Sequence, residues 1–400
     1  MSTGTILIVI CSLIIVAYLL ELLAKKLRIP AVLLLIGLGV GVKLITEQLG
    51  IVTFDFMRVI PTLGTLGLIL IVFEGGLELE YNRQKNKTIR NALLLSVLIL
   101  VATSVGIAFV FQYFTSASFY HCLVNAIPYS VISSAIAIPS AKSLGKDVRE
   151  FITFESSFSD IFGIVFYNYA LLYSSLTFAV IGALVLELSA VVVLSLLFCV
   201  FLLFLLRSIT HHVKFVMLIS LMVLLYAIGK ELHLSSLILV LIFGLLVRNI
   251  QLIKWEYIQK RYNADRFKKD FHMLHSITAE GVFLIKAFFF VIFGFIIDVN
   301  LLSDSSMWII AGATVGVIYL ARLVFLPLVL KKVFPELLFS PRGLISILLY
   351  LGLPESMKIP QLHVGLLFFI VLSTSLVMVS AAFFPAKKDV HESPEIKSEL

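Results

Sequence analysis

Charged side chains are scarce in this chain. Only 14% of its 400 residues are Asp, Glu, Lys or Arg, while 60% are hydrophobic and 33 are Phe. A water-soluble domain of this length needs far more polar surface to cover its core. The composition therefore excludes a soluble globule and predicts an integral membrane protein in contact with lipid.

Cysteine is rare, and the usual catalytic motifs are missing. Cys11, Cys122 and Cys199 each stand alone in an apolar segment, which excludes a disulfide framework and a cysteine-based metal site. The sequence contains no phosphate-binding Gly-rich loop with Lys-Ser/Thr, no His-Glu-x-x-His and no Gly-x-Ser-x-Gly. We therefore expect neither an enzyme nor a bound cofactor.

Long apolar runs recur along the whole chain. About 20 helical residues, at 1.5 Å per residue, cross the roughly 30 Å of hydrocarbon in a bilayer. We therefore predict an all-α polytopic membrane protein. Its thirteen expected spans are residues 4–24, 30–49, 60–80, 90–114, 120–143, 150–173, 176–206, 213–230, 234–250, 273–297, 308–331, 341–356 and 361–385.

The basic residues are distributed unevenly between the loops. If the odd-numbered loops lie inside, these loops and the tail hold 24 of the 31 Lys and Arg, whereas the opposite loops hold four. Cytoplasmic loops collect Lys and Arg, so we expect an outside N-terminus and a cytoplasmic C-terminus, in a bacterial inner membrane. The net charge of +7 then reflects topology, and we expect no nucleic-acid partner.

Two segments interrupt the ordinary spanning pattern. Residues 128–139 begin and end with proline and hold three serines, and residues 340–346 join Pro, Arg and Gly to a short apolar run. Proline removes a backbone donor, and nearby hydroxyls can satisfy freed backbone groups. Matching these segments pairs spans one to six with spans eight to thirteen as two inverted repeats, and interrupted helices in matching halves point to a binding site.

This plan divides the chain into scaffold and ion-binding regions. We expect scaffold and dimerisation helices over 1–80, an ion-binding half over 81–175, a linker helix and scaffold helices with a cytoplasmic loop at 251–272 over 176–297, a second ion-binding half over 298–386, and a cytoplasmic tail over 387–400.

Two carboxylates lie inside an apolar span, in the run Glu155-Ser156-Ser157-Phe158-Ser159-Asp160. An ionisable group there costs on the order of several kcal/mol and usually marks ion or proton movement. Residues four apart share a helix face, which places Ser156 with Asp160 and Glu155 with Ser159. Because desolvation penalises a charged carboxylate, Asp160 can hold either a proton or, together with Ser156, a hard cation such as Na⁺.

Three cationic side chains inside the spans need partners. Arg322 is the best partner for Glu155, since Arg suits a two-point carboxylate contact; the pair either holds the helices together or takes part in transport. Arg342 either binds carbonyls freed by the interrupted helix, repels competing cations, or snorkels to the cytoplasmic interface. Lys286 is a further candidate site residue. Its candidate partners are Glu280, Glu187 and Glu74.

The run Glu155-Ser156-x-x-Ser159-Asp160, taken with Arg322, resembles the monovalent cation/proton antiporter family, in particular its sodium/proton exchanger branch. Family members typically show Glu-Ser-x-x-Asn-Asp, so Ser159 stands where Asn is usual. The resemblance covers nearly the whole chain. It implies that Asp160 carries the ion, that Ser156 assists and that Glu155 pairs with Arg322.

One departure from the family pattern lies in the interrupted fifth span. Where the family usually reads Thr-Asp-Pro, this chain has Ile132-Ser133-Ser134. The usual acidic residue is missing, and Ser133 and Ser134 are candidates to supply hydroxyl ligands in its place. Since one carboxylate occupies the Asn-Asp position, the resemblance implies electroneutral one-for-one exchange.

These expectations combine into one function. We predict a homodimeric secondary antiporter that exchanges Na⁺ or Li⁺ for H⁺ by alternating access, with spans four to six and eleven to thirteen moving against the others. Two alternatives stay open. One is a K⁺/H⁺ antiporter, and the other is a membrane sensor or ion-leak effector that keeps the fold without coupled exchange.

Overall fold

The computed structural model of the chain describes the greater part of its 400 residues. It covers residues 3–27, 29–49, 60–79, 85–141, 144–172, 189–198, 214–232, 236–249, 264–297 and 305–381, with a few single positions between 182 and 234. Throughout this described part the secondary structure is helical, with turns and short extended links.

The α-helices lie where the apolar runs predict them. Their bounds are α1 (Thr3–Leu27), α2 (Ala31–Gln48), α3 (Ile60–Glu78), α4 (Asn86–Thr115), α5 (Phe119–Ser130), α6 (Ser134–Ser140), α7 (Lys146–Leu172), α9 (Lys214–Glu231), α10 (Ser236–Arg248), α12 (Ala264–Ile296), α13 (Ser305–Phe325), α14 (Leu344–Leu351) and α15 (Val364–Ser380). Three short 3-10 helices are η6 (Leu326–Leu328), η7 (Glu336–Leu338) and η8 (Glu355–Met357).

The predicted class, an all-α polytopic membrane protein, is confirmed. Within the described residues, six helical stretches are long and apolar enough to cross a bilayer. Large apolar side chains also stay exposed on the outer helices, such as Ile8 (69%) and Ile15 (60%) on α1, which lipid contact explains.

Some predicted boundaries need correction or lie outside the described residues. The helix expected over 273–297 begins earlier, at Ala264, so the last part of the expected loop 251–272 is helical. The span expected over 176–206 is described as a continuous helix only over residues 189–198, and the tail 387–400 lies outside the described part.

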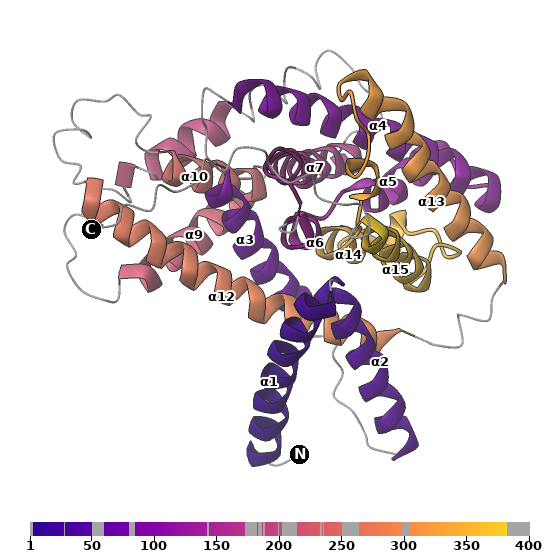
Figure 1. The fold of residues 1–400 in the computed structure, drawn as a ribbon, viewed down its shortest axis with the longest axis horizontal. Helices are drawn as coiled ribbons and strands as arrows, with labels where there is room; N and C mark the ends of the chain where they lie inside the picture. Colours follow the sequence, from indigo (N-terminus) through magenta and orange to yellow (C-terminus); the bar gives the residue numbers. More distant parts are fainter. Residues whose placement is uncertain are drawn as a thin grey trace, which may run out of the picture.

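The helices form two groups that meet along one boundary (Figure 1). The first group, which we call the α7 bundle, contains α4 to α7 and α13 to α15; α4 packs on α5, α7 and α13, and α15 packs on α13. The second group, which we call the α3 bundle, contains α1 to α3, α9, α10 and α12; α12 packs on α2 and α3, and α10 packs on α3. Across the boundary, α10 contacts α7, and α3 and α12 contact α14.

The two interrupted segments cross each other inside the α7 bundle. Residues 131–133 separate α5 from α6, and an irregular link over 339–343 precedes α14. The backbone N–H of Ser133 donates to the carbonyl of Pro341 at 2.9 Å, so each interruption satisfies a backbone group of the other. Irregular backbone at membrane depth is tolerated where protein buries it, as here.

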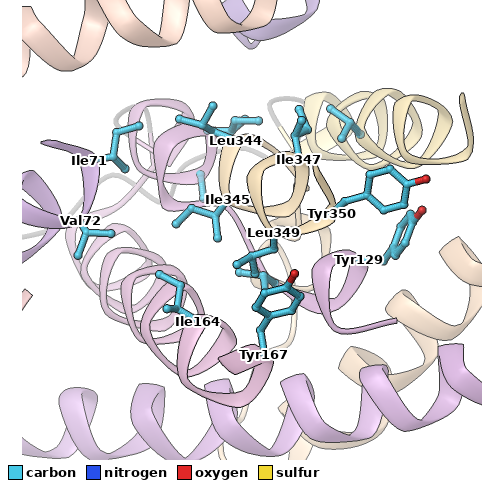
Figure 2. Close-up of a cluster of buried hydrophobic side chains, with 14 of the residues drawn as sticks. Ile71, Val72, Tyr129, Ile164, Tyr167, Leu344, Ile345, Ile347, Leu349 and Tyr350 are labelled. Atoms are coloured by element: carbon cyan, nitrogen blue, oxygen red, sulfur yellow. The ribbon is translucent and has the colours of Figure 1, made fainter. Parts of the chain in front are cut away.

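An apolar cluster surrounds the crossing (Figure 2). It joins Ile71 and Val72 of α3 to Ile164 of α7 and to Ile345 of α14. None of these four side chains is more than 7% exposed, so the two bundles meet largely through apolar contacts. The crossing therefore lies in a low-dielectric environment, where an unpaired charge is costly.

Candidate functional site

Asp160 lies within α7, opposite the start of α6, and only 7% of its surface is exposed. Its Oδ2 accepts a hydrogen bond from the backbone N–H of Ser134 at 3.2 Å. Its Oδ1 is buried and has no hydrogen-bond partner among the residues that the structure describes. A buried carboxylate oxygen without a partner needs a proton, a cation or a water to offset its desolvation.

Ser159 stabilises the helix break. Its Oγ accepts a hydrogen bond from the backbone N–H of Ile132 at 2.9 Å, a donor that the interruption between α5 and α6 leaves without a helical partner. The neighbouring Ser133 has a buried hydroxyl with no partner in the described part of the chain. Ser133 therefore offers a free oxygen at the crossing, whereas Ser159 is already engaged.

Ser156 is bonded to its own helix. Its hydroxyl donates to the carbonyl of Ile152 at 2.7 Å, and the carbonyl of Thr153 lies 3.3 Å away. The cavity beside Asp160 is lined by Ser157 and not by Ser156. The predicted shared face of Ser156 and Asp160 thus does not bring both side chains to this cavity.

The cavity lies between the two bundles. Its polar lining comes from Ser134, Ser157 and Asp160. The cavity volume is about 20 Å³, enough for one water molecule. The remaining walls are aliphatic apart from Gly75, and they belong to α3, α7, α10 and α14. Those aliphatic residues are Ile71, Val72, Ile161, Ile164, Leu237, Ile238, Leu241 and Ile345.

Glu155 and Arg322 form a buried ion pair. Arg322 Nη1 and Nη2 donate to the two carboxylate oxygens of Glu155 at 2.8 and 3.0 Å, and both side chains are at most 1% exposed. Nη2 also donates to the carbonyl of Glu336 at 2.7 Å, and Nε donates to that of Leu337 at 3.3 Å. These bonds join α7, α13 and η7, and the opposite charges compensate each other.

Arg342 binds the carbonyl groups of the crossing. Its Nε donates to the carbonyl of Tyr129, near the end of α5, at 2.6 Å, and its Nη1 donates to the carbonyl and the hydroxyl of Ser340 at 3.0 and 2.6 Å. The side chain is completely buried, so the snorkelling alternative is wrong. The guanidinium compensates the negative end of α5, as expected for a cation at a helix C-terminus.

Lys286 stays apart from this constellation. It is partly buried on α12 and makes no side-chain hydrogen bond or ion pair with any residue in the described ranges. Of its three candidate partners, Glu280 is exposed and Glu187 lies outside the described residues.

Comparisons with known proteins identify the family. A family model described as "Sodium/hydrogen exchanger, transmembrane" matches residues 10–388. The chain belongs to this family. It is therefore a cation/proton antiporter and a transporter rather than an enzyme, as the sequence predicted.

Solved structures of a sodium proton antiporter share the exchanger's fold. The structure of MjNhaP1 from Methanocaldococcus jannaschii at pH 8 aligns with a TM-score of 0.73 and 19% identity, covering 96% of this chain and 97% of that one. An electron-microscopy structure of the same antiporter aligns with a TM-score of 0.67 and 20% identity, covering 96% and 95%. No curated protein sequence matches the exchanger.

Two polar residues of the exchanger were missed from sequence. Ser157 precedes Asp160 by three positions, a spacing that also shares a helix face and could have identified it. Glu336 is 8% exposed, and its Oε2 has no partner in the described part. Burial, followed by repulsion from Glu155, raises the pKa of the Glu336 carboxyl, while Arg322 opposes this effect.

The cavity at Asp160 in the exchanger holds one carboxylate beside the hydroxyl groups of Ser134 and Ser157. The residues that the structure describes contain no group of three or more His, Cys, Asp or Glu side chains that could hold a metal ion. One carboxylate with neutral hydroxyl and backbone groups can bind a proton or a small cation reversibly. Because Arg322 already compensates Glu155, Asp160 is the acid of this pair that stays available.

Proposed function

We propose that the protein exchanges Na⁺, or Li⁺, for H⁺ across the membrane, and that both ions bind in turn at Asp160. The observation that carries this proposal is the buried Asp160 Oδ1, which has no hydrogen-bond partner in the described part and belongs to a residue that lines a cavity. A proton or a cation would offset the cost of burying this oxygen. If only the occupied forms cross between the two states of the carrier, competition for one carboxylate enforces exchange.

The ligands proposed beside Asp160 come from the interrupted helix. Ser133 and Ser134 begin α6, where the Ser134 N–H contacts the carboxylate and the Ser133 hydroxyl has no partner in the described chain. Ser159 and Ser156 would act indirectly, by holding the break and the helix in place. Hard cations such as Na⁺ prefer oxygen ligands of this kind.

The position of the site supports alternating access. Asp160 belongs to the α7 bundle, while the opposite wall of its cavity belongs to α3 and α10 of the α3 bundle. A movement of one bundle against the other would change the wall that seals Asp160 while the crossing itself moves as a unit. We propose that the α7 bundle is the ion-binding region and that the α3 bundle is the scaffold.

The charges support one-for-one electroneutral exchange. Glu155 is compensated by Arg322, and Arg342 faces carbonyl groups, so neither is needed to bind the transported ion and Asp160 would be the site that H⁺ and Na⁺ share. One negative charge can bind either one H⁺ or one Na⁺. Lys286 would stay outside this exchange, since it has no ion-pair partner in the described residues.

We further propose the membrane, the topology and the oligomeric state in which the exchange takes place. The distribution of Lys and Arg supports an outside N-terminus and a cytoplasmic C-terminus in a bacterial inner membrane. The exposed apolar face of α1 supports contact with lipid or with a second copy of the chain in a homodimer.

Purified protein in liposomes with an internal pH dye tests this function. A cation pulse should change the internal pH in the wild type and in Asp147→Asn, a matched control at an exposed position of the same helix. Asp160→Asn should abolish the response. Clamping the membrane potential should leave the rate unchanged if exchange is electroneutral.

The same assay separates the alternatives. A response to K⁺ but not to Na⁺ or Li⁺ would assign the protein as a K⁺/H⁺ antiporter. Cation flux without proton counterflow would identify a leak, and no flux in either direction would favour the sensor. Exchange that persists in Asp160→Asn would contradict the proposed role of this carboxylate.

A further inference from the structure

Three serines lie within four residues of Asp160 on α7, and their hydroxyl groups differ in the hydrogen bonds that they make. Ser156 donates to the carbonyl of Ile152, and Ser159 accepts from the N–H of Ile132. The hydroxyl of Ser157 is buried without any hydrogen-bond partner among the described residues. Ser157 is also the one of the three that lines the cavity with Asp160.

On the long helices, Ser157 shares an unpartnered buried hydroxyl with Thr103 and Ser375 among the described residues, but of these three only Ser157 lines the cavity beside Asp160. Other buried hydroxyls on long helices, such as those of Ser104, Thr314 and Thr374, donate to the carbonyl four residues earlier at 2.7 to 2.8 Å. Such a bond is open to most helical serines. A buried hydroxyl that stays unsatisfied costs about 1–3 kcal/mol, so the orientation of Ser157 toward the cavity needs an explanation.

A transported cation supplies that explanation. Ser157 and Asp160 are three positions apart and lie on one helix face. The hydroxyl oxygen and the partnerless carboxylate oxygen belong to two residues that line one cavity, between α3 and α10 on one side and α7 on the other. A hard cation in this cavity can accept lone pairs from both oxygens, whereas a proton on Asp160 needs no second ligand.

We propose that the Ser157 hydroxyl is a further side-chain ligand of the transported cation, on α7 beside Asp160, and contributes to the affinity for it. This inference rests on the proposed function of Asp160 as the shared site. It separates the two halves of the cycle, because Ser157 contributes to the cation-loaded state and not to the proton-loaded state.

The test compares Ser157→Ala with the wild type in liposomes, over a range of Na⁺ concentrations at fixed pH. We expect the half-saturating Na⁺ concentration to rise about tenfold or more, as for loss of one contact to a charged group, with the maximal rate nearly unchanged. Because protons then compete more effectively, the pH of half-maximal activity at fixed Na⁺ should rise as well. Ser157→Thr, which keeps the hydroxyl, should restore the affinity.

Two further variants make the result specific. Ser104→Ala removes a buried helical serine of α4 that bonds its own helix, and it should leave Na⁺ affinity unchanged. Ser156→Ala tests the rival assignment, in which Ser156 and not Ser157 binds the cation. A rise in half-saturating Na⁺ in Ser156→Ala and not in Ser157→Ala would overturn the inference.

The melting temperature gives a readout independent of transport. Ser157→Ala breaks no protein hydrogen bond and should melt at or above the wild-type temperature.

Failure of the inference can be distinguished from failure of the proposed function. If Asp160→Asn abolishes exchange while Ser157→Ala keeps the wild-type Na⁺ affinity, Ser157 is not a ligand and the function of Asp160 stands. If Asp160→Asn still exchanges, the shared carboxylate itself is refuted, whatever Ser157→Ala does.

Discussion

Arg322 on α13 donates to both carboxylate oxygens of Glu155 on α7, at 2.8 and 3.0 Å, where neither side chain is more than 1% exposed. The same guanidinium binds the carbonyl groups of Glu336 and Leu337. The contact therefore connects the helix that carries Asp160 to the segment that leads into the second interruption. It also leaves Asp160 as the buried acid of α7 without a cationic partner in the described residues.

Removing one member of this pair should destabilise the protein strongly. Arg322→Leu leaves the Glu155 carboxylate buried and unpaired, which should cost about 3–5 kcal/mol and lower the melting temperature in detergent. The double variant Glu155→Leu/Arg322→Leu should melt above Arg322→Leu because no isolated charge remains. The matched control is Glu150→Gln in the partly exposed Lys85–Glu150 pair, at 2.7 Å, where a loss of about 0–1 kcal/mol is expected. Equal losses at both pairs would contradict this account.

Arg342→Lys should destabilise the crossing although it keeps the charge. One ammonium group cannot reproduce the separate contacts of Nε with Tyr129 and of Nη1 with Ser340. We expect a loss of about 2 kcal/mol, measured as a lower melting temperature. Arg149→Lys, at an exposed position of the same protein, is the control and should have little effect.

Gly343→Ala should disturb the contact between the two interruptions. An added Cβ would lie 2.6 Å from Ile136 Cδ1 and from Ser133 Oγ and 3.0 Å from Ser133 Cβ, so both of these side chains at the crossing would have to shift. The expected cost is about 1–3 kcal/mol, and exchange should slow as well. Gly312→Ala on α13 meets no atom within 4 Å and should be neutral or stabilising by about 0.5–1 kcal/mol. Similar melting temperatures for both variants would count against close packing at Gly343.

Glu336→Gln should stabilise the protein more at high pH than at low pH. Burial raises the pKa of the Glu336 carboxyl, so the folded protein holds this proton more tightly than the unfolded chain does. Stability then falls as the pH rises through the raised pKa, and Gln removes that loss. The gain in melting temperature over the wild type should be larger at pH 8 than at pH 5. A gain independent of pH, or one also seen in the exposed control Glu231→Gln, would contradict the prediction.

Much of the fold followed from the sequence because the bilayer restricts the alternatives. Apolar runs near 20 residues must form helices when no water is available to the backbone. The prolines of residues 128–139 and Pro341 predicted where helices would be interrupted, and the structure has breaks at 131–133 and 339–343. The start of α12 was placed too late, since the polar residues after Ala264 continue a helix beyond the apolar run.

The site was predictable only in part. Helical periodicity showed that Glu155 and Asp160 face different directions, and Arg322 was the best cation available to Glu155 although 167 positions separate them. Periodicity alone could not choose between Ser156 and Ser157, because spacings of three and four both share a face with Asp160. The difference depends on which side of α7 meets α3 and α10.

By itself, the sequence determined that the chain is a bundle of membrane helices with two breaks and a carboxylate in the apolar interior. Composition and proline positions suffice for this, because unsatisfied backbone and charge are costly in hydrocarbon wherever they occur. Only the tertiary structure decided which buried oxygens are paired and which are free. Arg322 compensates the charge of Glu155, and the backbone N–H of Ile132 donates to the hydroxyl of Ser159. The packing of the α3 bundle against α7 leaves Asp160 and Ser157 at one cavity. Those pairings depend on contacts between segments far apart in the chain, which no local pattern records.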